Sequence, residues 1–459
     1  MTEHRGTAEA ADGLPVPQRY WAAIGIWLAI SVAVLNGAMV NVALPTISAE
    51  MGVSAAVSTW AVTSYQVAVV MLLLPVAMLG EIVGYRRVFI GGVMLGAAAA
   101  VASALSHGLA GLAVARFLQG LGDAATMGIN GALLRFTYPR SEIGRGIGYN
   151  ALVVAVMAAA GPAIAAAILA VASWRWLFAI HVPFALLALL IGWRFLPRVP
   201  PGGHRFDFLS AACNAIAFGG LFLFLSDVVH GTLGVRAGAE LVLGAGAAVI
   251  LVQRSRGRAR PMIPLDLLGV PLLRLSYVTS SCSFAALFTI TISMPFVLQQ
   301  RFGFSHVETG MFLTALSLGT AVGAPLAARL ADRHSPALLC AVGLGLMAIG
   351  MLVLLLAPGA ASPFYLAPPM ALAGFGFGMF QTPNNRVMLT VAPPHRAGAA
   401  AGMLAIARLV GQTGGVLVVT LLFQTAGPAS GVPLMVGLVL AVIAATASLR
   451  RTRHIGEAH

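Results

Sequence analysis

Apolar residues fill fourteen long stretches of this chain, and short polar joints separate them. The hydrocarbon core of a bilayer is ~30 Å thick, so a helix needs ~20 mainly apolar residues to cross it. A helix also satisfies its own backbone hydrogen bonds, which lets it lie among lipid tails. We predict an all-α polytopic membrane protein with fourteen transmembrane helices, at residues 21–43, 55–79, 88–106, 109–135, 147–171, 175–196, 207–229, 238–253, 275–298, 308–330, 337–357, 364–390, 398–424 and 431–449.

Arginine is concentrated in alternate joints of this pattern, and the chain contains no lysine. On one side of the predicted membrane the joints contain only Arg175, Arg236 and Arg301. Joints rich in arginine stay in the cytoplasm, so we expect both termini to be cytoplasmic. The arginines assigned to the cytoplasmic side are Arg86, Arg87, Arg135, Arg140, Arg145, Arg194, Arg198, Arg205, Arg254, Arg256, Arg258, Arg260, Arg274, Arg329, Arg333, Arg396, Arg450, Arg451 and Arg453.

The two longest joints divide the helices into groups of six, two and six. They lie on either side of the seventh and eighth predicted helices. Two related halves of this kind are common in transporters. The predicted units are a cytoplasmic tail (1–20), a six-helix bundle (21–196), an inserted helix pair with its flanking loops (197–274), a second six-helix bundle (275–449) and a second tail (450–459).

Composition excludes several classes of protein. Hydrophobic residues make up 59% of the chain and charged residues 9%, whereas a soluble domain has ~25% charged residues. The net charge of +13 is spread over short joints, so we expect no nucleic acid partner. Cys213, Cys282 and Cys340 fall in separate apolar stretches, which indicates lone thiols and no metal site. The first apolar stretch lacks a small-residue cleavage site and is interpreted as a retained helix.

Two cytoplasmic joints combine an acidic residue with arginines. The first also contains two glycines, which allow a tight turn. In the first joint we expect a charge relay that locks the helix ends, and the second joint has the same character at the corresponding place in the other half. The residues are Gly80, Glu81, Gly84, Arg86 and Arg87 in the first joint, and Asp332 with Arg329 and Arg333 in the second.

Further motifs follow in order along the chain: NVALPTI (41–47), STWAVTSYQVA (58–68), ARFLQGLG (115–122), AAAGPAIAA (158–166), WRWLFAIHVP (174–183), FQTPNNR (380–386) and RLVGQTGG (408–415). Together they resemble the motifs of the major facilitator superfamily, in particular the fourteen-span drug:proton antiporters of the EmrB/QacA type. The resemblance extends from residue 20 to about residue 450. It implies the major facilitator fold and a place in the inner (cytoplasmic) membrane of a bacterium.

The chain departs from that family pattern at several positions. Asn36 stands where the family usually has an aspartate, and Glu81 replaces another aspartate. Ala165 and Ala166 replace the glycine pair that often closes the fifth-helix motif, and His181 stands where asparagine is usual. The missing acid at position 36 raises the question of which residue carries a proton.

The predicted helix at 109–135 has a polar stripe on one face. Ionisable groups at bilayer depth cost ~2.5–3.5 kcal/mol on insertion scales, so they usually have a function. Arg116 and Asp123 are seven residues apart, or ~10.5 Å along the helix axis, which is too far for a direct pair unless side chains or water bridge them. We therefore expect this face to line a water-filled cavity between the two halves. The stripe consists of Arg116, Gln119, Gly120, Asp123, Met127 and Asn130.

Asp123 is the only carboxylate that the sequence places well inside the membrane. We hypothesise that it carries the coupled proton in place of the missing acid at position 36. The resemblance links Arg116 to proton handling as well. The alternative is structural: Asp123 completes a polar contact with Arg116 or with the first helix, and Arg116 clamps an ion pair or a carbonyl group.

Other polar residues are candidates for lining the cavity or for hydrogen bonds between helices. Gly161 and Pro162 are expected to loosen the predicted helix at 147–171, because proline removes a backbone bond and kinks the helix. The resemblance implies that such a bend shapes the cavity. His181 is interpreted as a hydrogen-bonded packing residue. The candidates are Asn36, Gln119, Met127, Asn130, Asn150, Gln381, Asn384, Arg408 and Gln412.

The resemblance implies a secondary transporter that exports hydrophobic or amphipathic small molecules in exchange for protons. Its ligands are a small-molecule substrate and protons. We expect a monomer surrounded by lipid, with no cofactor, no metal, no nucleotide and no enzymatic activity, because no nucleophile–base constellation or phosphate-binding loop is present. A dedicated exporter of one metabolite remains the alternative. A receptor or integral enzyme is more remote, because no joint is long enough for a sensor domain.

Overall fold

The computed structural model describes residues 12–139, 141–199, 206–229, 234–256, 265–358, 362–392 and 397–455, and their regular secondary structure is helical throughout. The first part contains α1 (Gln18–Glu50), α2 (Ala55–Ser58), α3 (Trp60–Val83), α4 (Tyr85–Ala104), α5 (Leu109–Thr137), α6 (Ile143–Val171), α7 (Trp176–Ala179), α8 (His181–Phe195), α9 (Phe208–Val229) and α10 (Val235–Ser255). The second contains η1 (Leu265–Gly269), α11 (Pro271–Phe296), η2 (Val297–Arg301), α12 (His306–Leu330), α13 (Pro336–Leu355), α14 (Pro363–Thr390), α15 (Ala397–Ala426) and α16 (Val432–Ile455).

Parts of the predicted tails and joints lie outside the described residues. These are residues 1–11 and 456–459, and within the joints the residues Arg140, 200–205, 230–233, 257–264, 359–361 and 393–396.

Local chemistry explains several helix boundaries. Gly84 adopts a φ of +102° between α3 and α4, a conformation that favours glycine, as the predicted turn requires. Ser305 begins α12 with a capping box, in which its side chain and that of Glu308 each accept a backbone hydrogen bond. The first helix was expected to end at residue 43, but it continues through Pro45 to Glu50.

The prediction of fourteen membrane spans is met only in part. Twelve helices in the described residues are long and apolar enough to cross a membrane. The helices α5 and α14 are not among them, although they contain 29 and 28 residues. The reason for α5 is its polar content, including Arg116, Asp123 and Arg135. The fold is therefore that of an all-helical polytopic membrane protein with twelve clearly apolar spans.

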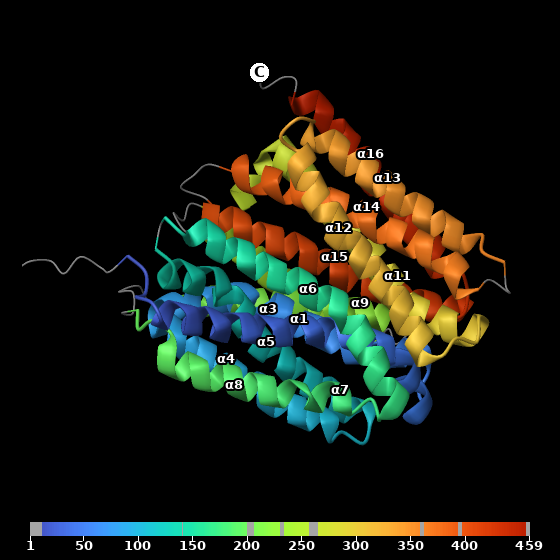
Figure 1. Ribbon diagram of the computed structural model, residues 1–459, viewed down its shortest axis with the longest axis horizontal. Coiled ribbons are helices and arrows are strands. Elements are labelled where there is room, and N and C mark those ends of the chain that lie inside the picture. The colour runs from blue at the N-terminus through green and yellow to red at the C-terminus, as the bar shows by residue number, and fades with distance from the viewer. Residues whose placement is uncertain are drawn as a thin grey trace, which may run out of the picture.

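The helices form two groups that lie side by side (Figure 1). In the first, α1 packs against α6 and α8, while α3 and α4 pack against α5. In the second, α12 and α13 pack against α14, while α15 and α16 pack against α11. The groups meet where α6 contacts α12, α3 contacts α15, and α1 contacts α11. The pair α9–α10 lies beside this boundary, because α9 contacts both α3 and α15.

The apolar core is shared between the groups at one end of the helices and divided at the other. Far from the termini, one cluster contains Met39 and Leu44 of α1 together with Phe288 and Phe296 of α11. Near the termini, the first group has its own cluster around Phe89, Ile129 and Ala188, and the second has one around Tyr277, Met388 and Met403. Hence the groups are sealed together at the far end and part toward the end that bears the termini.

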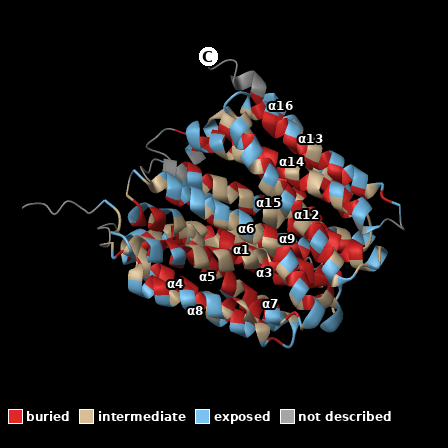
Figure 2. Cartoon of the chain, viewed as in Figure 1, coloured by how far each residue is buried: buried red, intermediate tan, exposed pale blue. Residues whose placement is uncertain are grey.

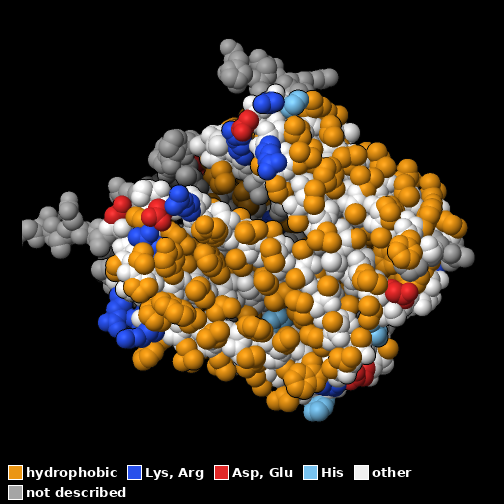
Figure 3. Space-filling model, in the orientation of Figure 1, with side chains coloured by type: hydrophobic (Ala, Val, Ile, Leu, Met, Phe, Trp, Pro, Cys, Tyr) orange, Lys and Arg blue, Asp and Glu red, His pale blue; other side chains and the backbone are white. Residues whose placement is uncertain are grey.

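The surface agrees with this arrangement. Large hydrophobic side chains such as Val114, Leu190 and Val322 are exposed. Figures 2 and 3 show exposed residues and hydrophobic side chains over the outside of the molecule, where lipid would contact them. Figure 3 also shows a hollow between the two groups, on the side of the tails.

The contact between α6 and α12 generates a prediction about stability. A Cβ atom on Gly310 would lie 2.1 Å from Cβ of Ala166 and 2.8 Å from the Pro162 carbonyl oxygen. Gly310→Ala therefore forces the two groups apart, and we expect it to lower the free energy of unfolding by about 1–3 kcal/mol. The matched control is Gly345→Ala on α13, where nothing lies within 4 Å. Thermal unfolding in detergent should give a lower Tm for the first variant, and equal Tm values would contradict the contact.

Candidate functional site

A buried network in the first group of helices contains both charged residues of the predicted stripe. The side chain of Arg116 on α5 is 1% exposed. Its Nε donates to the Ala61 carbonyl oxygen at 2.9 Å, and its Nη1 donates to Asn36 Oδ1 at 3.1 Å and to Gln119 Oε1 at 2.7 Å. The guanidinium group is thus satisfied by neutral acceptors from α1, α3 and α5.

Asn36 bridges the two charges. While its Oδ1 accepts from Arg116, its Nδ2 donates to Asp123 Oδ2 at 3.2 Å. Arg116 and Asp123 are thus too far apart for a direct pair, as expected, and the Asn36 amide hydrogen-bonds to both. An amide has a donor and an acceptor at opposite corners, as this position requires. A carboxylate at position 36 would instead place two acids next to each other.

Tyr65 of α3 is a member of the network that the sequence analysis missed. Its hydroxyl donates to Asp123 Oδ2 at 3.0 Å, and the Ala33 carbonyl oxygen lies 3.4 Å from the same hydroxyl. The Arg116 guanidinium lies 4.3 Å from the centre of the Tyr65 ring, a cation–π contact. A tyrosine in an apolar helix resembles a packing residue, so only a comparison of helix faces could have indicated this role.

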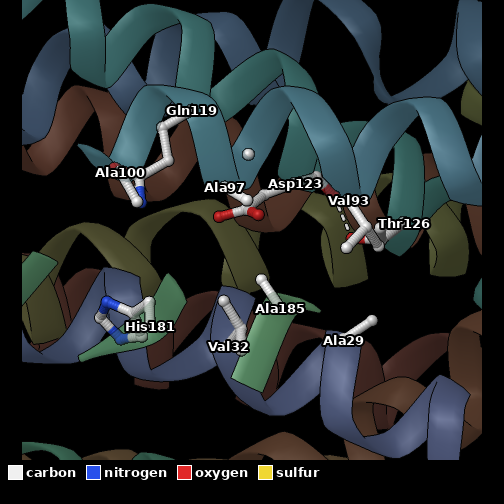
Figure 4. Close-up of a pocket in the computed structure, with 11 residues that line it drawn as sticks. Ala29, Val32, Val93, Ala97, Ala100, Gln119, Asp123, Thr126, His181 and Ala185 are labelled. Atoms are coloured by element: carbon white, nitrogen blue, oxygen red, sulfur yellow. Dashed lines mark hydrogen bonds between the residues drawn. The ribbon is translucent and has the colours of Figure 1, made fainter. Parts of the chain in front are cut away.

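A small cavity adjoins Asp123 (Figure 4). Its volume is about 20 Å³, which is room for about one water molecule, and its walls come from α1, α4, α5 and α8. The Asp123 carboxylate points into this space from α5 (Figure 4). Its Oδ2 accepts two hydrogen bonds, whereas Oδ1 has none within the described part of the chain and lies near Gly96 of α4. One carboxylate oxygen thus has no hydrogen-bond partner among the described residues.

His181 lines the same cavity from the start of α8 (Figure 4). It is 2% exposed, and neither ring nitrogen has a hydrogen-bond partner among the described residues. The Leu177 and Phe178 carbonyl groups lie near the ring without suitable geometry. His181 is buried as a packing residue should be, but neither ring nitrogen makes a well-formed hydrogen bond to a described residue. With Gln119, Asp123 and Thr126, His181 forms the polar part of a cavity whose other walls are mostly alanine and valine.

The position of this cavity corrects one expectation. We expected Asp123 to line a cavity between the two halves, but every residue that lines the cavity lies between Ala29 and Ala185. The polar face of α5 turns toward α1 and α4 inside the first group. The link to the other half is indirect: Tyr65, Val69 and Ala124 form an apolar cluster with Leu409 of α15.

The remaining candidates fall into two sets. Asn130 of α5 donates to Asn150 of α6 at 3.2 Å, and both are partly buried, as is Met127. Arg408 and Gln412 are partly buried on α15, and Gln381 is partly buried on α14. These residues remain candidates for lining the space between the groups.

Asn384 does not line that space. It is fully buried, and its Oδ1 accepts from Arg451 Nη1 at 2.6 Å. Arg451, which we expected in a cytoplasmic joint, is only 1% exposed and also donates to Ser276 and Ser448. The sequence placed Arg451 just beyond the last apolar stretch, but α16 continues to Ile455 and carries it into the interior of the second group.

The two charged joints use partners other than the expected ones. Arg86 donates to the Trp193 carbonyl oxygen of α8, and no ion pair to Glu81 occurs among the described residues. Asp332 pairs with Arg386 of α14 at 2.8 Å, and Arg333 beside it is exposed. The sequence suggested neighbours along the chain, whereas the contacts join helix ends that are distant in sequence.

Gly161 and Pro162 lie inside α6, which remains one helix from Ile143 to Val171. A Cβ atom on Gly161 would lie 2.7 Å from Cβ of Ala38 of α1. The Pro162 carbonyl faces Gly310 of α12. The motif therefore allows α6 to approach both α1 and α12, and it does not end the helix.

The chain is similar to known proteins in sequence and in fold. The family model described as "Major Facilitator Superfamily" matches residues 26–416. The chain is 46% identical over 443 residues to "Uncharacterized transporter YebQ" of Escherichia coli (strain K12), covering 95% of this chain and 96% of that protein. It is 32% identical to "Puromycin resistance protein pur8" of Streptomyces alboniger, covering 89% and 82%. Among solved structures, a bacterial homologue of the human lysosomal transporter Spinster, in an inward-facing and occupied conformation, matches with a TM-score of 0.71 at 15% identity, covering 96% and 98%.

The bridging role of Asn36 generates a second prediction. Asn36→Leu leaves Arg116 and Asp123 each without one partner, and we expect a loss of about 1–3 kcal/mol in the free energy of unfolding. Asn41→Leu on the same helix is the control, because Asn41 Oδ1 is buried without a partner. A lower Tm for Asn36→Leu than for Asn41→Leu is expected in detergent. The reverse order would show that the amide does not hold the charges together.

Proposed function

Because the chain belongs to the Major Facilitator Superfamily, a family of membrane transporters, we propose that it exports small amphipathic molecules in exchange for protons by alternating access. The observation that carries this proposal is the buried network of Arg116, Asn36, Asp123 and Tyr65 with its adjoining cavity. The name of the relative from Streptomyces alboniger, which speaks of puromycin resistance, supports drug export.

Asp123 is the proton carrier in this proposal. Other carboxylates in the described residues, such as Glu50, Asp227 and Asp332, lie at helix ends or in joints, whereas Asp123 lies in the middle of α5. Its free Oδ1 supplies a place for the proton, and the cavity supplies a route for water. Arg116 fixes the orientation of Asn36 and balances the charge when the carboxylate is ionised.

Protonation changes the bonds that Asp123 makes. The ionised carboxylate accepts from Asn36 and Tyr65, and a neutral carboxyl group is a weaker acceptor. The Tyr65 hydroxyl then turns toward the Ala33 carbonyl oxygen, which is already within 3.4 Å. Tyr65 packs with Leu409 of α15, so a shift of this ring alters the contact between the two groups. A proton can move a two-state equilibrium only through such a difference in contacts.

Alternating access follows from the arrangement of the cores. One apolar cluster joins the two groups at the end far from the termini, whereas each group has its own cluster near the termini. In the proposal, this is a state open toward the termini. The two groups rock about the contacts of α6 with α12 and of α3 with α15. Small residues such as Gly310 and Ala166 allow this motion, because their helices touch through flat surfaces.

We include α5 and α14 among the spans and so retain fourteen. The 29 residues of α5 extend about 43 Å, more than a bilayer core, and the helix packs between α3 and α4. Arg116 and Asp123 are buried against α1 and α3, so the polarity of α5 does not exclude a membrane position. The arginine-rich joints support a cytoplasmic location of both termini in a bacterium, and a monomer is part of the proposal.

The proton carrier is tested by Asp123→Asn in proteoliposomes with an imposed pH gradient. We expect flux of a dye or drug to fall to the level of protein-free liposomes, because the amide cannot release a proton. The matched control is Asp227→Asn, which changes a carboxylate paired with the exposed Arg236 at the far end of α9. A panel of dyes and drugs in the same assay separates broad export from export of one metabolite. Retained pH-driven flux in Asp123→Asn would exclude this carrier.

A double variant tests whether the position of the acid within the network matters. Asn36→Asp with Asp123→Asn moves the carboxylate from α5 to α1 and keeps one acid within reach of Arg116. We expect pH-driven flux to recover to within about tenfold of the original, a barrier difference of about 1.4 kcal/mol. If the double variant is as inactive as Asp123→Asn alone, the carboxylate must lie at position 123 itself.

A further inference from the structure

Arg408 lies deep in α15 without the partners that the other buried arginines have. It is about 16 Å along the axis from the first residue of the helix, Ala397. No hydrogen bond or ion pair joins it to any described residue, and its Nε is buried without a partner. By contrast, Arg116 has three acceptors and Arg451 contacts Asn384, Ser276 and Ser448.

The faces of α15 show where Arg408 points. Gly411 and Gly415 lie against α11, because Cβ atoms there would meet Phe284 and Phe288. Gly402 lies near Leu74 of α3. At 100° per residue, Arg408 and Gln412 fall between the face toward α11 and the face toward α3. The exposed Val410 and Leu421 lie on the opposite face, where lipid is expected. Arg408 therefore faces the space between the two groups.

No acid of the second group is in a position to neutralise this charge. Between residues 271 and 455 the sequence has two acids, Glu308 and Asp332. Glu308 caps the start of α12, and Asp332 pairs with Arg386 near its end. An uncompensated guanidinium at bilayer depth is costly. It is retained where water or a ligand anion reaches it.

The surroundings of Arg408 suit an organic acid. The Phe284 ring lies 5.8 Å from the guanidinium carbon, and Phe377 packs edge-on against Phe284 at 5.0 Å. Gln412 lies one turn farther along the same face of α15, where its amide is available for a hydrogen bond. A guanidinium binds a carboxylate through two parallel hydrogen bonds, and the aromatic wall accommodates an apolar body beside it. A cationic ligand is repelled at this point.

We propose that Arg408 is the recognition site for the carboxylate of an amphipathic organic acid, which is the substrate class of this transporter. The proposal rests on the proposed export function. The acid enters from the side that bears the termini, because the far end is sealed by the shared core. Its carboxylate binds Arg408, and its apolar part lies against Phe284.

The experiment measures binding to the purified full chain in detergent, without any requirement for transport. The probes are pyrenebutyrate, its methyl ester and pyrenebutylamine, which share one fluorescent body and differ in charge. Fluorescence titration should give a Kd for the acid at least about tenfold lower than for the ester or the amine, a difference of about 1.4 kcal/mol in binding free energy. Titrations of protein-free micelles correct for partition of each probe into detergent.

Three variants make the assignment specific. Arg408→Gln should lose the preference for the acid, and Arg408→Lys should retain part of it, because the charge remains without the planar fork. Arg386→Gln, which removes an arginine from the surface pair with Asp332, should bind the acid as the original protein does. Thermal unfolding verifies that each variant is folded, and Arg408→Lys decides the question if Arg408→Gln is not.

Equal binding of the acid by Arg408→Gln and the original protein would overturn the proposal, as would a preference of the original protein for the amine. These outcomes are distinguishable from a failure of the export proposal. A protein that prefers the acid but shows no pH-driven flux in proteoliposomes keeps the anion site and loses proton-coupled export. A protein that transports cationic dyes but does not prefer the acid keeps proton-coupled export and loses the anion site.

Discussion

The buried ion–amide–ion arrangement in the first group of helices constrains the rest of that group. Arg116 and Asp123 are two helical turns apart on α5 and cannot meet each other, so each needs partners from other helices. Asn36 of α1 and Tyr65 of α3 supply them. Removing one partner of a buried charge is far more costly than losing a neutral contact. The relative positions of α1, α3 and α5 are therefore set by polar geometry, while the apolar surfaces around them are permissive.

The sequence predicted most of the architecture, because length and hydrophobicity alone determine whether a helix can cross a bilayer. The polar stripe on α5 was also predictable, since helical periodicity places residues on one face. Periodicity does not say which helix that face meets, and so the cavity beside Asp123 was expected between the halves and lies within one of them. For the same reason the partners of Arg86 and Asp332 were sought among neighbours in the chain.

Residues with an unremarkable sequence context were the hardest to predict. Tyr65 lies in an apolar helix and looked like packing, and Arg451 lies just beyond the last apolar stretch and looked like a loop arginine. Both are buried, because their helices bring them against polar groups of other helices: Asp123 in one case and Asn384 in the other. The sequence around such a residue does not reveal that it forms a buried hydrogen bond, because its partner lies on another helix.

The buried arginines Arg116 and Arg408 have different surroundings in the two groups. This difference affects how a proton and a substrate could be coupled. The first group surrounds Arg116 with acceptors and keeps a titratable acid near it, whereas the second leaves Arg408 open to the space between the groups. If the substrate is an anion at Arg408 and the proton is on Asp123, the two ligands do not compete for one carboxylate. Their coupling must then be mechanical. Leu409, the neighbour of Arg408, and Tyr65, the partner of Asp123, lie in one apolar cluster, which physically connects the two sites. A change at either site alters the packing of α3 against α15, which is one of the contacts on which the two groups move.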